Sequence, residues 1–476
     1  MPIMNIHMLP LLALLAFVAT ACGGKEPVGP PPDGTAAAVH SVIISPDTAT
    51  LSLAGTRQLA AIVRDFSGNA LTGRPVTWTS LDPRIARVSE EGTVTAVAAG
   101  TVKIAASSES RSDTASIAVS PFLSGERTLV PGVIHRYVWD AAKPWAIHIL
   151  EVNPRACGVD LRTAKAKDNL IGRTRTTALA AQVQERLSRP VVAAINGDFF
   201  TPLGVPQGAQ VADAEIIKTS ATSPAFGLTF EKIPFIGVHA LAGELRARSG
   251  PSQPLRQVNE RPDAQSVALY NRFWGSSTPS DTGAVEVVVS LLPTTGGRRE
   301  TVKGVVLQVD TTAAGVAIPP GGAVLAGRSQ VGAFLRTNVT TGDTLTWTYR
   351  FRDAPGHVTE MIGGNFQLLR GGQDVLGEAA DRERQPRTGI GLKPDGTVLM
   401  VTVDGRQPSY SVGMSQPEMI ELFRQLGATE LLNLDGGGST TMGLYGQLAN
   451  RPSEPSGERP GANALTVRGP AAGACK

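Results

Sequence analysis

The stretch TVLMVTVDGRQPSYSVGMSQPEMIELFRQLGATELLNLDGGGST (397–440) decides the fold of the larger part of this 476-residue chain. Residues 397–403 form one continuous apolar, β-branched run and residues 429–434 form another, so both are typical of buried strands. Between them, Ser415 and Glu418 form an S-x-x-E capping box ahead of an apolar stripe, which predicts a helix over 416–426. Strand, helix and strand over this length is a βαβ unit, whose two strands run parallel.

Polar residues follow each of these strands where it ends. Asp404-Gly405-Arg406 follows the first strand, and Asp435 follows the second. The carboxyl ends of parallel strands meet at one edge of a sheet, where open α/β sheets place their ligand sites. A third apolar run, VVAAI (191–195), ends in Asn196-Gly197-Asp198, so we expect three strand ends to converge on one pocket.

Two carboxylates at one sheet edge suit acid/base or nucleophilic chemistry on a glycosidic bond. Taken alone, an Asp-Gly pair is more often a turn, and a glycine run is more often a flexible loop. The neighbouring Arg406, together with Arg387 and Thr388 on the preceding strand, favours an anionic substrate, because a guanidinium fork fits phosphate oxygens. The glycine run 436–438 would let backbone N–H groups approach that anion closely.

Several ordered motifs resemble the phosphodiester glycosidase family. They are NGDFF (196–200), PQGAQVADAEI (206–216), PRTGIG (386–391), VDGRQ (403–407), LNLDGGGSTTM (432–442), Asn450 and Glu458-Arg459. The resemblance covers most of residues 127–468 and is strongest over 386–465. It implies hydrolysis of the bond between the anomeric carbon of a sugar and a phosphate. Phosphate leaves as a weak base, so positioning and charge stabilisation should matter more than protonation.

The resemblance also implies roles for individual residues. Asp404 and Asp435 would stabilise an oxocarbenium-like centre or activate water, and Arg387 and Arg406 would clamp the phosphate. The remaining candidates would hold sugar hydroxyls, orient the acids or contact the anion: Asn196, Thr388, Gly436, Gly437, Gly438, Ser439, Asn450 and Arg459. Asp198 and Glu458 are the next candidates should the two aspartates prove uninvolved.

The composition excludes some classes of protein. Lys+Arg 44 against Asp+Glu 41 gives a net charge of +3, which argues against nucleic-acid binding. The three cysteines have no CxxC spacing and the six histidines no HExxH motif, which argues against a zinc hydrolase. We predict no metal site, and the cofactor requirement is left open.

The N-terminus predicts export. Residues 8–21 are apolar but too few to span a bilayer, as in the core of a signal peptide over 1–21. Ala19-Thr20-Ala21-Cys22 resembles the lipobox of bacterial lipoproteins, whose cysteine is lipidated, although an ordinary signal with an incidental cysteine is the alternative. Residues 22–40 would form a flexible tether. The expected location is the cell envelope, with the lipid-anchored protein facing the periplasm or the exterior.

Residues 41–120 carry short strand patterns separated by turn residues, which predict a β-sandwich. They resemble a bacterial Ig-like domain of group 2, with Trp78 in the core and Gly92 and Gly100 in turns. This segment holds no clustered acids or bases. We therefore expect a spacer that is dispensable for chemistry, with attachment to carbohydrate or to a surface as the alternative.

Residues 127–468 are expected to form one large α+β domain with a mixed sheet and few helices, one of them over 177–187. The overall expectation is thus a multidomain chain, with a small all-β sandwich ahead of a large α+β domain. The stretch 231–360 has weaker landmarks and could carry insertions that shape specificity. Cys157 and Cys475 lie near opposite ends of this domain, and export permits disulfides, so we predict that they pair.

Other functions remain open at this point. The first is a catalytically silent surface lipoprotein that binds an envelope glycopolymer, and the second is a transferase that uses the same site. GAVLAGRS (322–329) nearly spells a phosphate loop but has Arg328 in place of lysine, and its interior is typical of a strand. Ser439 does not lie in a GxSxG elbow, which argues against a serine hydrolase.

Overall fold

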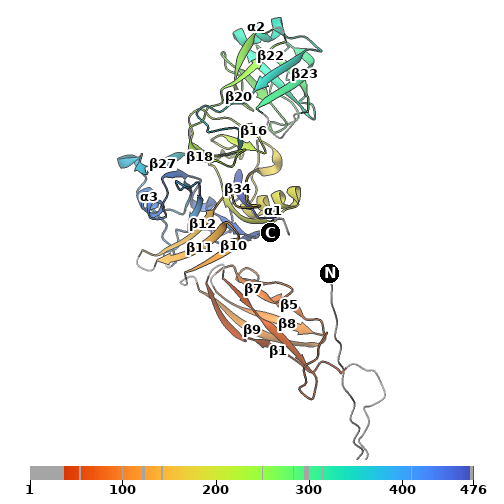
Figure 1. The fold of residues 1–476 in the computed structure, drawn as a ribbon, viewed down its shortest axis with the longest axis vertical. Helices are drawn as coiled ribbons and strands as arrows, with labels where there is room; N and C mark the ends of the chain where they lie inside the picture. The colour runs from red at the N-terminus through yellow and green to blue at the C-terminus, as the bar shows by residue number, and fades with distance from the viewer. Residues whose placement is uncertain are drawn as a thin grey trace, which may run out of the picture.

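The computed structural model describes residues 37–475, apart from gaps at 53–54, 99, 121–123, 141–142, 249, 282, 294–299, 313–314, 409 and 472–474. Figure 1 shows an elongated molecule of three parts: the Ig-like domain at one end, a layered central part and a β-barrel at the other end. The predicted signal peptide, Cys22 and most of the predicted tether lie outside the described residues.

The Ig-like domain is the predicted β-sandwich. Ile104 and Ile117 are fully buried in its core, whereas Trp78, which we expected in the core, is only partly buried against it. Gly92 has a φ of +84° and lies in a turn against the Trp78 ring, where a Cβ atom would have no room. The strands are β1 (Ser41–Ser45), β2 (Thr48–Ser52), β3 (Thr56–Gln58), β4 (Ala60–Arg64), β5 (Thr77–Ser80), β6 (Ala86–Val88), β7 (Thr93–Ala96), β8 (Gly100–Ser108) and β9 (Arg111–Ser120).

An eight-stranded sheet forms one layer of the central part, in the order β10-β11-β12-β30-β29-β31-β27-β28. The predicted βαβ strands β30 and β31 are each antiparallel to β29, which lies between them, so they run parallel without being neighbours. Every described neighbouring pair in this sheet is antiparallel, although we expected a mixed sheet. The strands are β10 (Gly125–Val130), β11 (Val133–Asp140), β12 (Trp145–Val152), β27 (Phe366–Arg370), β28 (Gln373–Asp374), β29 (Arg387–Leu392), β30 (Val398–Val403) and β31 (Glu430–Asn433).

Two five-stranded sheets complete the central part, in the orders β13-β34-β14-β32-β33 and β16-β15-β26-β17-β18. Their side chains share one hydrophobic core with the eight-stranded sheet, in which Met400 packs with Ile195, Phe226 and Ile362. The strands are β13 (Asp160–Lys165), β14 (Val191–Asn196), β15 (Gln210–Ala212), β16 (Glu215–Lys218), β17 (Ala225–Thr229), β18 (Pro234–Gly237), β26 (Val358–Gly363), β32 (Met442–Leu444), β33 (Gln447–Leu448) and β34 (Asn463–Arg468).

The helices are few, as expected. α3 (Gln416–Gln425) has the predicted capping box, since Ser415 Oγ accepts from the Glu418 backbone N–H and the Glu418 carboxylate accepts from Ser415 N–H. Its Met419 and Phe423 cover the outer face of the eight-stranded sheet. The other helices are α1 (Thr176–Leu187), also predicted, α2 (Ser329–Asn338), which was not, and the short 3₁₀ turns η1 (Ala166–Asp168), η2 (Gly377–Ala379) and η3 (Gly437–Ser439).

The stretch between β18 and β26 folds as a closed seven-stranded barrel, whose hydrophobic core continues into the β16-β15-β26-β17-β18 sheet. Trp347, Leu325 and Val287 fill its interior, and α2 packs on β22 and β24. GAVLAGRS is strand β24, as its interior predicted, and not a phosphate loop. The barrel strands are β19 (Gly243–Arg246), β20 (Ser252–Val258), β21 (Val267–Tyr270), β22 (Ala284–Leu291), β23 (Thr301–Asp310), β24 (Gly322–Arg328) and β25 (Thr344–Thr348).

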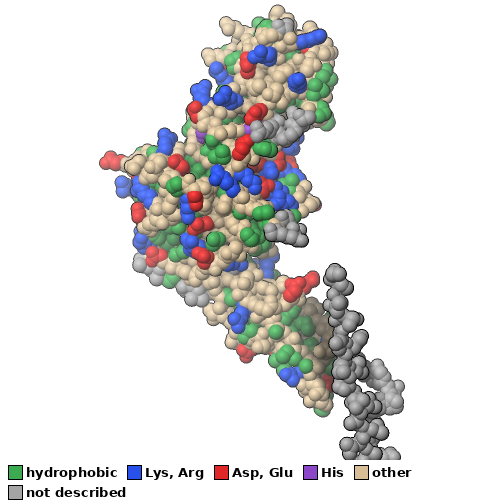
Figure 2. Space-filling view, viewed as in Figure 1, with side chains coloured by type: hydrophobic (Ala, Val, Ile, Leu, Met, Phe, Trp, Pro, Cys, Tyr) green, Lys and Arg blue, Asp and Glu red, His purple; other side chains and the backbone are tan. Residues whose placement is uncertain are grey.

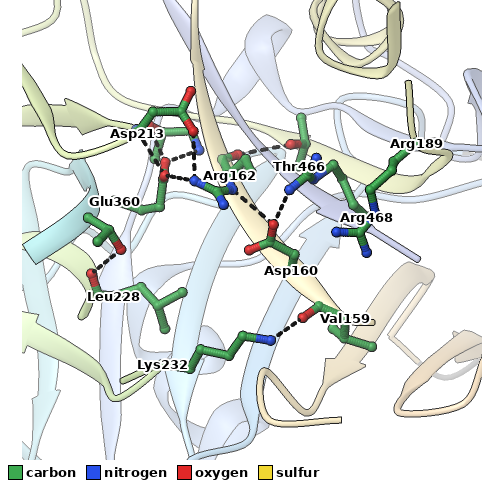
Figure 3. A network of polar contacts seen from close by, with 12 residues as sticks. Val159, Asp160, Arg162, Arg189, Asp213, Leu228, Lys232, Glu360, Thr466 and Arg468 are labelled. Atoms are coloured by element: carbon green, nitrogen blue, oxygen red, sulfur yellow. Dashed lines mark hydrogen bonds and ion pairs between the residues drawn. The ribbon is translucent and has the colours of Figure 1, made fainter. Parts of the chain in front are cut away.

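An ion-pair network joins two of the central sheets (Figure 3). Arg162 on β13 contacts Asp160 at 2.9 Å, Asp213 at 2.6 Å and Glu360 on β26 at 3.0 Å. Arg468 also contacts Asp160. Burial raises the pKa of Glu360 to about 7, although the Arg162 charge opposes the shift. The network ties β13 and β34 to the sheet that leads into the barrel.

Cys157 and Cys475 form a disulfide with a Cα–Cα distance of 5.9 Å, so the predicted pairing is confirmed. Acidic and basic side chains intermingle over the central part in Figure 2, in keeping with the small net charge. No helix within the described residues is long and apolar enough to cross a membrane.

Candidate active site

Two of the three predicted strand ends meet directly, because Asn196 at the end of β14 contacts Asp435 at the end of β31. Its Nδ2 donates to the Asp435 carbonyl at 2.6 Å, and its Oδ1 accepts from the Thr388 hydroxyl at 2.8 Å and from Thr441 N–H at 3.0 Å. Asp435 N–H also donates to the Gly197 carbonyl at 3.0 Å. Asn196 and Thr388 are both buried, so their polar groups serve as internal connectors between the β14 sheet and the eight-stranded sheet.

Asp404, at the end of β30, is buried with its carboxylate fully engaged. Oδ1 accepts from Asn450 Nδ2 at 2.8 Å, and Oδ2 accepts from the Tyr410 hydroxyl at 3.1 Å and from Arg451 N–H at 2.9 Å. Burial raises the pKa of Asp404 to about 6, while these donors lower it. A 1 % exposed carboxylate with three donors is suited to holding the surrounding loops rather than to meeting a substrate.

Asn450 orients the carboxylate of Asp404, which is one of the roles expected for it. Its Nδ2 contacts Asp404 and also donates to the Thr440 carbonyl at 3.1 Å, and its Oδ1 accepts from Met442 N–H at 2.7 Å. The buried amide therefore fixes the loop after the glycine run against β30.

Asp435, at the end of β31, differs from Asp404 because it is only half-buried. Burial raises its pKa, and the Ser439 hydroxyl and the charge of Arg459 oppose that shift. Of the two predicted aspartates, Asp435 is the one placed to meet a ligand.

Asp198 lies beside Asp435, since the Asp435 amide binds the peptide carbonyl just ahead of Asp198. Its Oδ2 accepts from Gly208 N–H at 2.6 Å, and its Oδ1 has no hydrogen-bond partner among the described residues. Burial raises the pKa of Asp198 to about 7, and the negative charge of Asp435 adds to the rise. Asp198 and Asp435 thus form a pair of carboxyl groups that differ in burial.

Arg387 requires a correction. Its Nε donates to the Met414 carbonyl at 2.9 Å, and its Nη2 donates to Asp381 Oδ2 at 2.6 Å and to the Glu383 carbonyl at 2.8 Å. Successive residues of a strand point to opposite faces, so Thr388 faces Asn196 while Arg387 faces away. The predicted phosphate clamp is therefore not formed by Arg387, whose guanidinium fixes the segment ahead of β29 against the loop that leads into α3.

The glycine run is bordered by the other two candidate arginines. Gly437 has a φ of +58°, and a Cβ built there would come within 3.1 Å of Arg406 Nη2, while a Cβ on Gly438 would meet Arg459 and Glu454. Arg406 Nε donates to Gln385 at 2.8 Å, and Arg459 pairs with Glu454. Small residues over 436–438 thus let two guanidinium groups lie against the turn that follows Asp435.

Other candidates have structural roles or were missed. Glu458 accepts from Thr177 N–H at 2.8 Å and from its hydroxyl at 2.6 Å, so it caps the first turn of α1.

Two residues of the site carried no signal in the sequence. Tyr410 contacts Asp404, and Asn463 contacts the Asp198 amide. No group of three or more His, Cys, Asp or Glu side chains in the described ranges could hold a metal ion.

Comparisons with known proteins match both parts of the chain. Residues 297–468 match the family model for phosphodiester glycosidase, and residues 38–119 match that for the bacterial Ig-like domain of group 2. The first match begins inside the barrel and leaves out NGDFF (196–200).

A prophage-derived protein, YomE, of Bacillus subtilis (strain 168) is 37% identical over 87 residues, 18% of this chain and 13% of that protein. N-acetylglucosamine-1-phosphodiester alpha-N-acetylglucosaminidase of Mus musculus is 38% identical over 111 residues, 20% of this chain and 21% of the mouse protein. The chain thus spans about a fifth or less of the length of these curated relatives.

A solved structure of a hypothetical protein from Synechocystis shares the fold, with a TM-score of 0.59 and 19% identity over 90% of this chain and 80% of that one. Together with the predicted motifs of 386–442, the matches show that residues 297–468 are similar to the phosphodiester glycosidase family and that residues 38–119 are similar to the bacterial Ig-like domain of group 2.

Proposed function

We propose that this protein is an exported hydrolase that cleaves the bond between the anomeric carbon of a sugar and the phosphate of a phosphodiester in a cell-envelope or extracellular glycan. The observation that carries the proposal is the position of Asp435. It is half-buried where the ends of β14 and β31 meet, the charge of Arg459 lowers its pKa, and it precedes a glycine turn.

The phosphate would lie over the glycine turn. Arg406 and Arg459 border residues 436–438; Arg406 is exposed and Arg459 partly exposed, whereas Arg387 is buried. Guanidinium groups and backbone N–H groups stabilise the charge that grows on the departing phosphate. This arrangement replaces the clamp that the sequence suggested for Arg387.

Water would attack the anomeric carbon with Asp435 as its base. The proton of the water passes to the Asp435 carboxylate as the carbon–oxygen bond breaks and its electron pair moves to the phosphate oxygen. Asp198, whose pKa is raised by burial to about 7, would be partly protonated beside it near neutral pH, and its protonated form would favour the negative charge on Asp435. Asp404 would hold the loop around residue 450 in place through Asn450 and Arg451.

Export and lipidation at Cys22 are part of the proposal. The disulfide between Cys157 and Cys475 supports an oxidising compartment. The protein would then face the periplasm or the exterior of the cell envelope, held by its lipid on the membrane.

The test is release of free sugar from sugar-1-phosphodiesters that differ in sugar and in aglycone, beginning with methyl N-acetylglucosamine-1-phosphate. Wild-type protein should release the sugar and an alkyl phosphate, and Asp435→Asn should not. A panel on which wild-type protein releases nothing, while still binding the substrates, would favour a catalytically silent glycan-binding lipoprotein instead.

A further inference from the structure

The barrel is fixed to the central part by buried hydrogen bonds next to the candidate site. Asn259 Nδ2 donates to the Ile217 carbonyl at 2.8 Å, and Asn271 Nδ2 donates to the Ile216 carbonyl at 2.8 Å. The two asparagines are buried and bind each other at 2.7 Å. Because these amides hold the backbone of β16, the barrel has a defined position relative to the central sheets.

A cavity of about 560 Å³ lies at this junction. Its walls come from the segment after β16, which includes Thr219 and Ser220, from Arg256 on β20, from the loop that follows β20, and from Arg352 after β25. Hydroxyl and guanidinium groups therefore face a space that could hold about two sugar units.

One ion pair links this cavity to Asp198. Glu260 in the cavity wall contacts Lys218 Nζ at 3.2 Å, and the same ammonium donates to the Gln207 carbonyl at 3.0 Å. Gln207 N–H donates in turn to the Phe199 carbonyl at 2.9 Å. The positive charge of Lys218 also lowers the pKa of the Asp198 carboxyl, against the larger effect of burial. The cavity is thus one side chain away from the loop that carries NGDFF.

The charges of the cavity are not balanced. Glu260 is occupied by Lys218 and by the Thr219 hydroxyl, and Asp263 accepts from Gln265 N–H and from both the N–H and the hydroxyl of Ser266. Arg256 and Arg352 are exposed, and in the described part of the chain their side chains make no ion pair. The acids are therefore satisfied internally, while two guanidinium groups are available to a ligand.

We propose that this cavity binds the part of an anionic glycan that continues beyond the scissile phosphodiester, with Arg256 and Arg352 contacting its next phosphate. The inference rests on the proposed function, because it assigns the barrel to the substrate of that same site. The barrel and the central part would together bind a polymer of phosphodiester-linked sugars rather than a single modified sugar.

The experiment compares two substrates on the full chain. One is methyl N-acetylglucosamine-1-phosphate, and the other is a trimer of N-acetylglucosamine units joined by 1-phosphodiesters. The double variant Arg256→Gln/Arg352→Gln should lower kcat/KM for the trimer by about tenfold or more and leave the methyl compound unchanged, because only the trimer reaches the cavity. Arg336→Gln, an exposed arginine on α2 that does not line the cavity, should change neither value.

The outcomes separate this inference from the proposed function. Equal values for both substrates in the double variant, or the same loss in Arg336→Gln, would overturn the cavity assignment while the hydrolase stands. If wild-type protein cleaves neither substrate, calorimetric binding of the trimer decides instead. Binding that weakens with salt and in the double variant supports the cavity, and binding equal in all three proteins refutes it.

Discussion

Tyr410 donates its hydroxyl to Oδ2 of Asp404 at 3.1 Å, and its ring belongs to the same hydrophobic cluster as the core of the Ig-like domain. Tyr137 and Ala146 of the eight-stranded sheet belong to the same cluster, so this sheet and the Ig-like domain share hydrophobic contacts. Trp139 Nε1 also donates to the Tyr410 carbonyl at 3.1 Å. The Ig-like domain, which the sequence suggested was a dispensable spacer, therefore packs against a residue that positions the buried acid of the candidate site.

Tyr410→Phe should test this connection, because it removes a donor from a buried carboxylate and keeps the packing. We expect a loss of about 1–3 kcal/mol in the free energy of unfolding and a further rise of the Asp404 pKa, since the hydroxyl lowers it. Chemical denaturation measures the first effect, and the pH profile of the unfolding free energy measures the second. An unchanged profile and unchanged stability would show that the contact is unimportant.

Asp435→Asn and Asp404→Asn should fail in different ways. Asp435→Asn should fold normally and lower kcat by about a hundredfold or more, as loss of a positioned base does. Asp404→Asn should mainly lower the melting temperature, because its new amide would face the donors of Asn450, Tyr410 and Arg451. Turnover measured per folded molecule separates the two, and a stable but inactive Asp404→Asn would restore Asp404 as a reacting group.

Arg387→Lys should act on stability rather than on substrate binding. An ammonium cannot reach Asp381 and the carbonyls of Glu383 and Met414 at once, so we expect a loss of about 1–3 kcal/mol in unfolding free energy. The KM for a sugar phosphodiester should stay within about twofold of wild type. Arg459→Lys is the matched comparison, and a rise in KM for Arg387→Lys instead would reinstate the phosphate clamp.

Asp198 should give the protein a pH-dependent stability of defined sign. Its pKa is about 7 in the folded chain against an ordinary value of 3.8, so the folded state binds the extra proton between those values. Its contribution to stability is present below about pH 4 and is lost as the pH rises to about 7. The free energy of unfolding of wild type minus that of Asp198→Asn, measured by urea denaturation from pH 4 to 8, should fall over this window, and a difference that rises would contradict the burial of Asp198.

Cys22→Ala should move the full chain from the detergent phase to the aqueous phase in a phase-separation experiment. The reason is that the lipid on Cys22 would be the anchor, and residues 22–40 are polar. A Cys157→Ala/Cys475→Ala variant, which removes only the disulfide, should stay in the detergent phase. Equal partitioning of Cys22→Ala and wild type would remove the lipoprotein interpretation.

The local features of this protein could be predicted from its sequence, and most tertiary ones, apart from the Cys157–Cys475 disulfide, could not. Ser415 and Glu418 predict α3 because a capping box is a local arrangement. The apolar runs before Asp404 and Asp435 predict strands because they too are local patterns. That β29 would lie between β30 and β31 depends on pairing over long distances in the sequence, and so does the contact of Tyr410 with Asp404. The barrel was missed because its short alternating strands resemble those of the central sheets.

The error on Arg387 has a physical lesson of its own. Thr388 and Arg387 are adjacent on one strand, so only one of them could face Asn196. The guanidinium group of Arg387 suits a phosphate chemically. However, side chains alternate between the two faces of a strand, and in this strand Thr388 is the residue that faces Asn196. The burial of Asp198 and its nearness to Asp435 depend on the fold, so the sequence does not reveal them.

The place of β34 has a consequence for how this protein is made. It lies between β13 and β14, which precede it by about 300 residues, whereas the Ig-like domain and the barrel are each built from strands close together in the chain. A ribosome would deliver every strand of both modules while the middle of the molecule still lacked β34. The acids of the candidate site would come together only after residue 468 had been synthesised. A chain that stopped earlier would contain all strands of the Ig-like domain and of the barrel, but its candidate site would be incomplete.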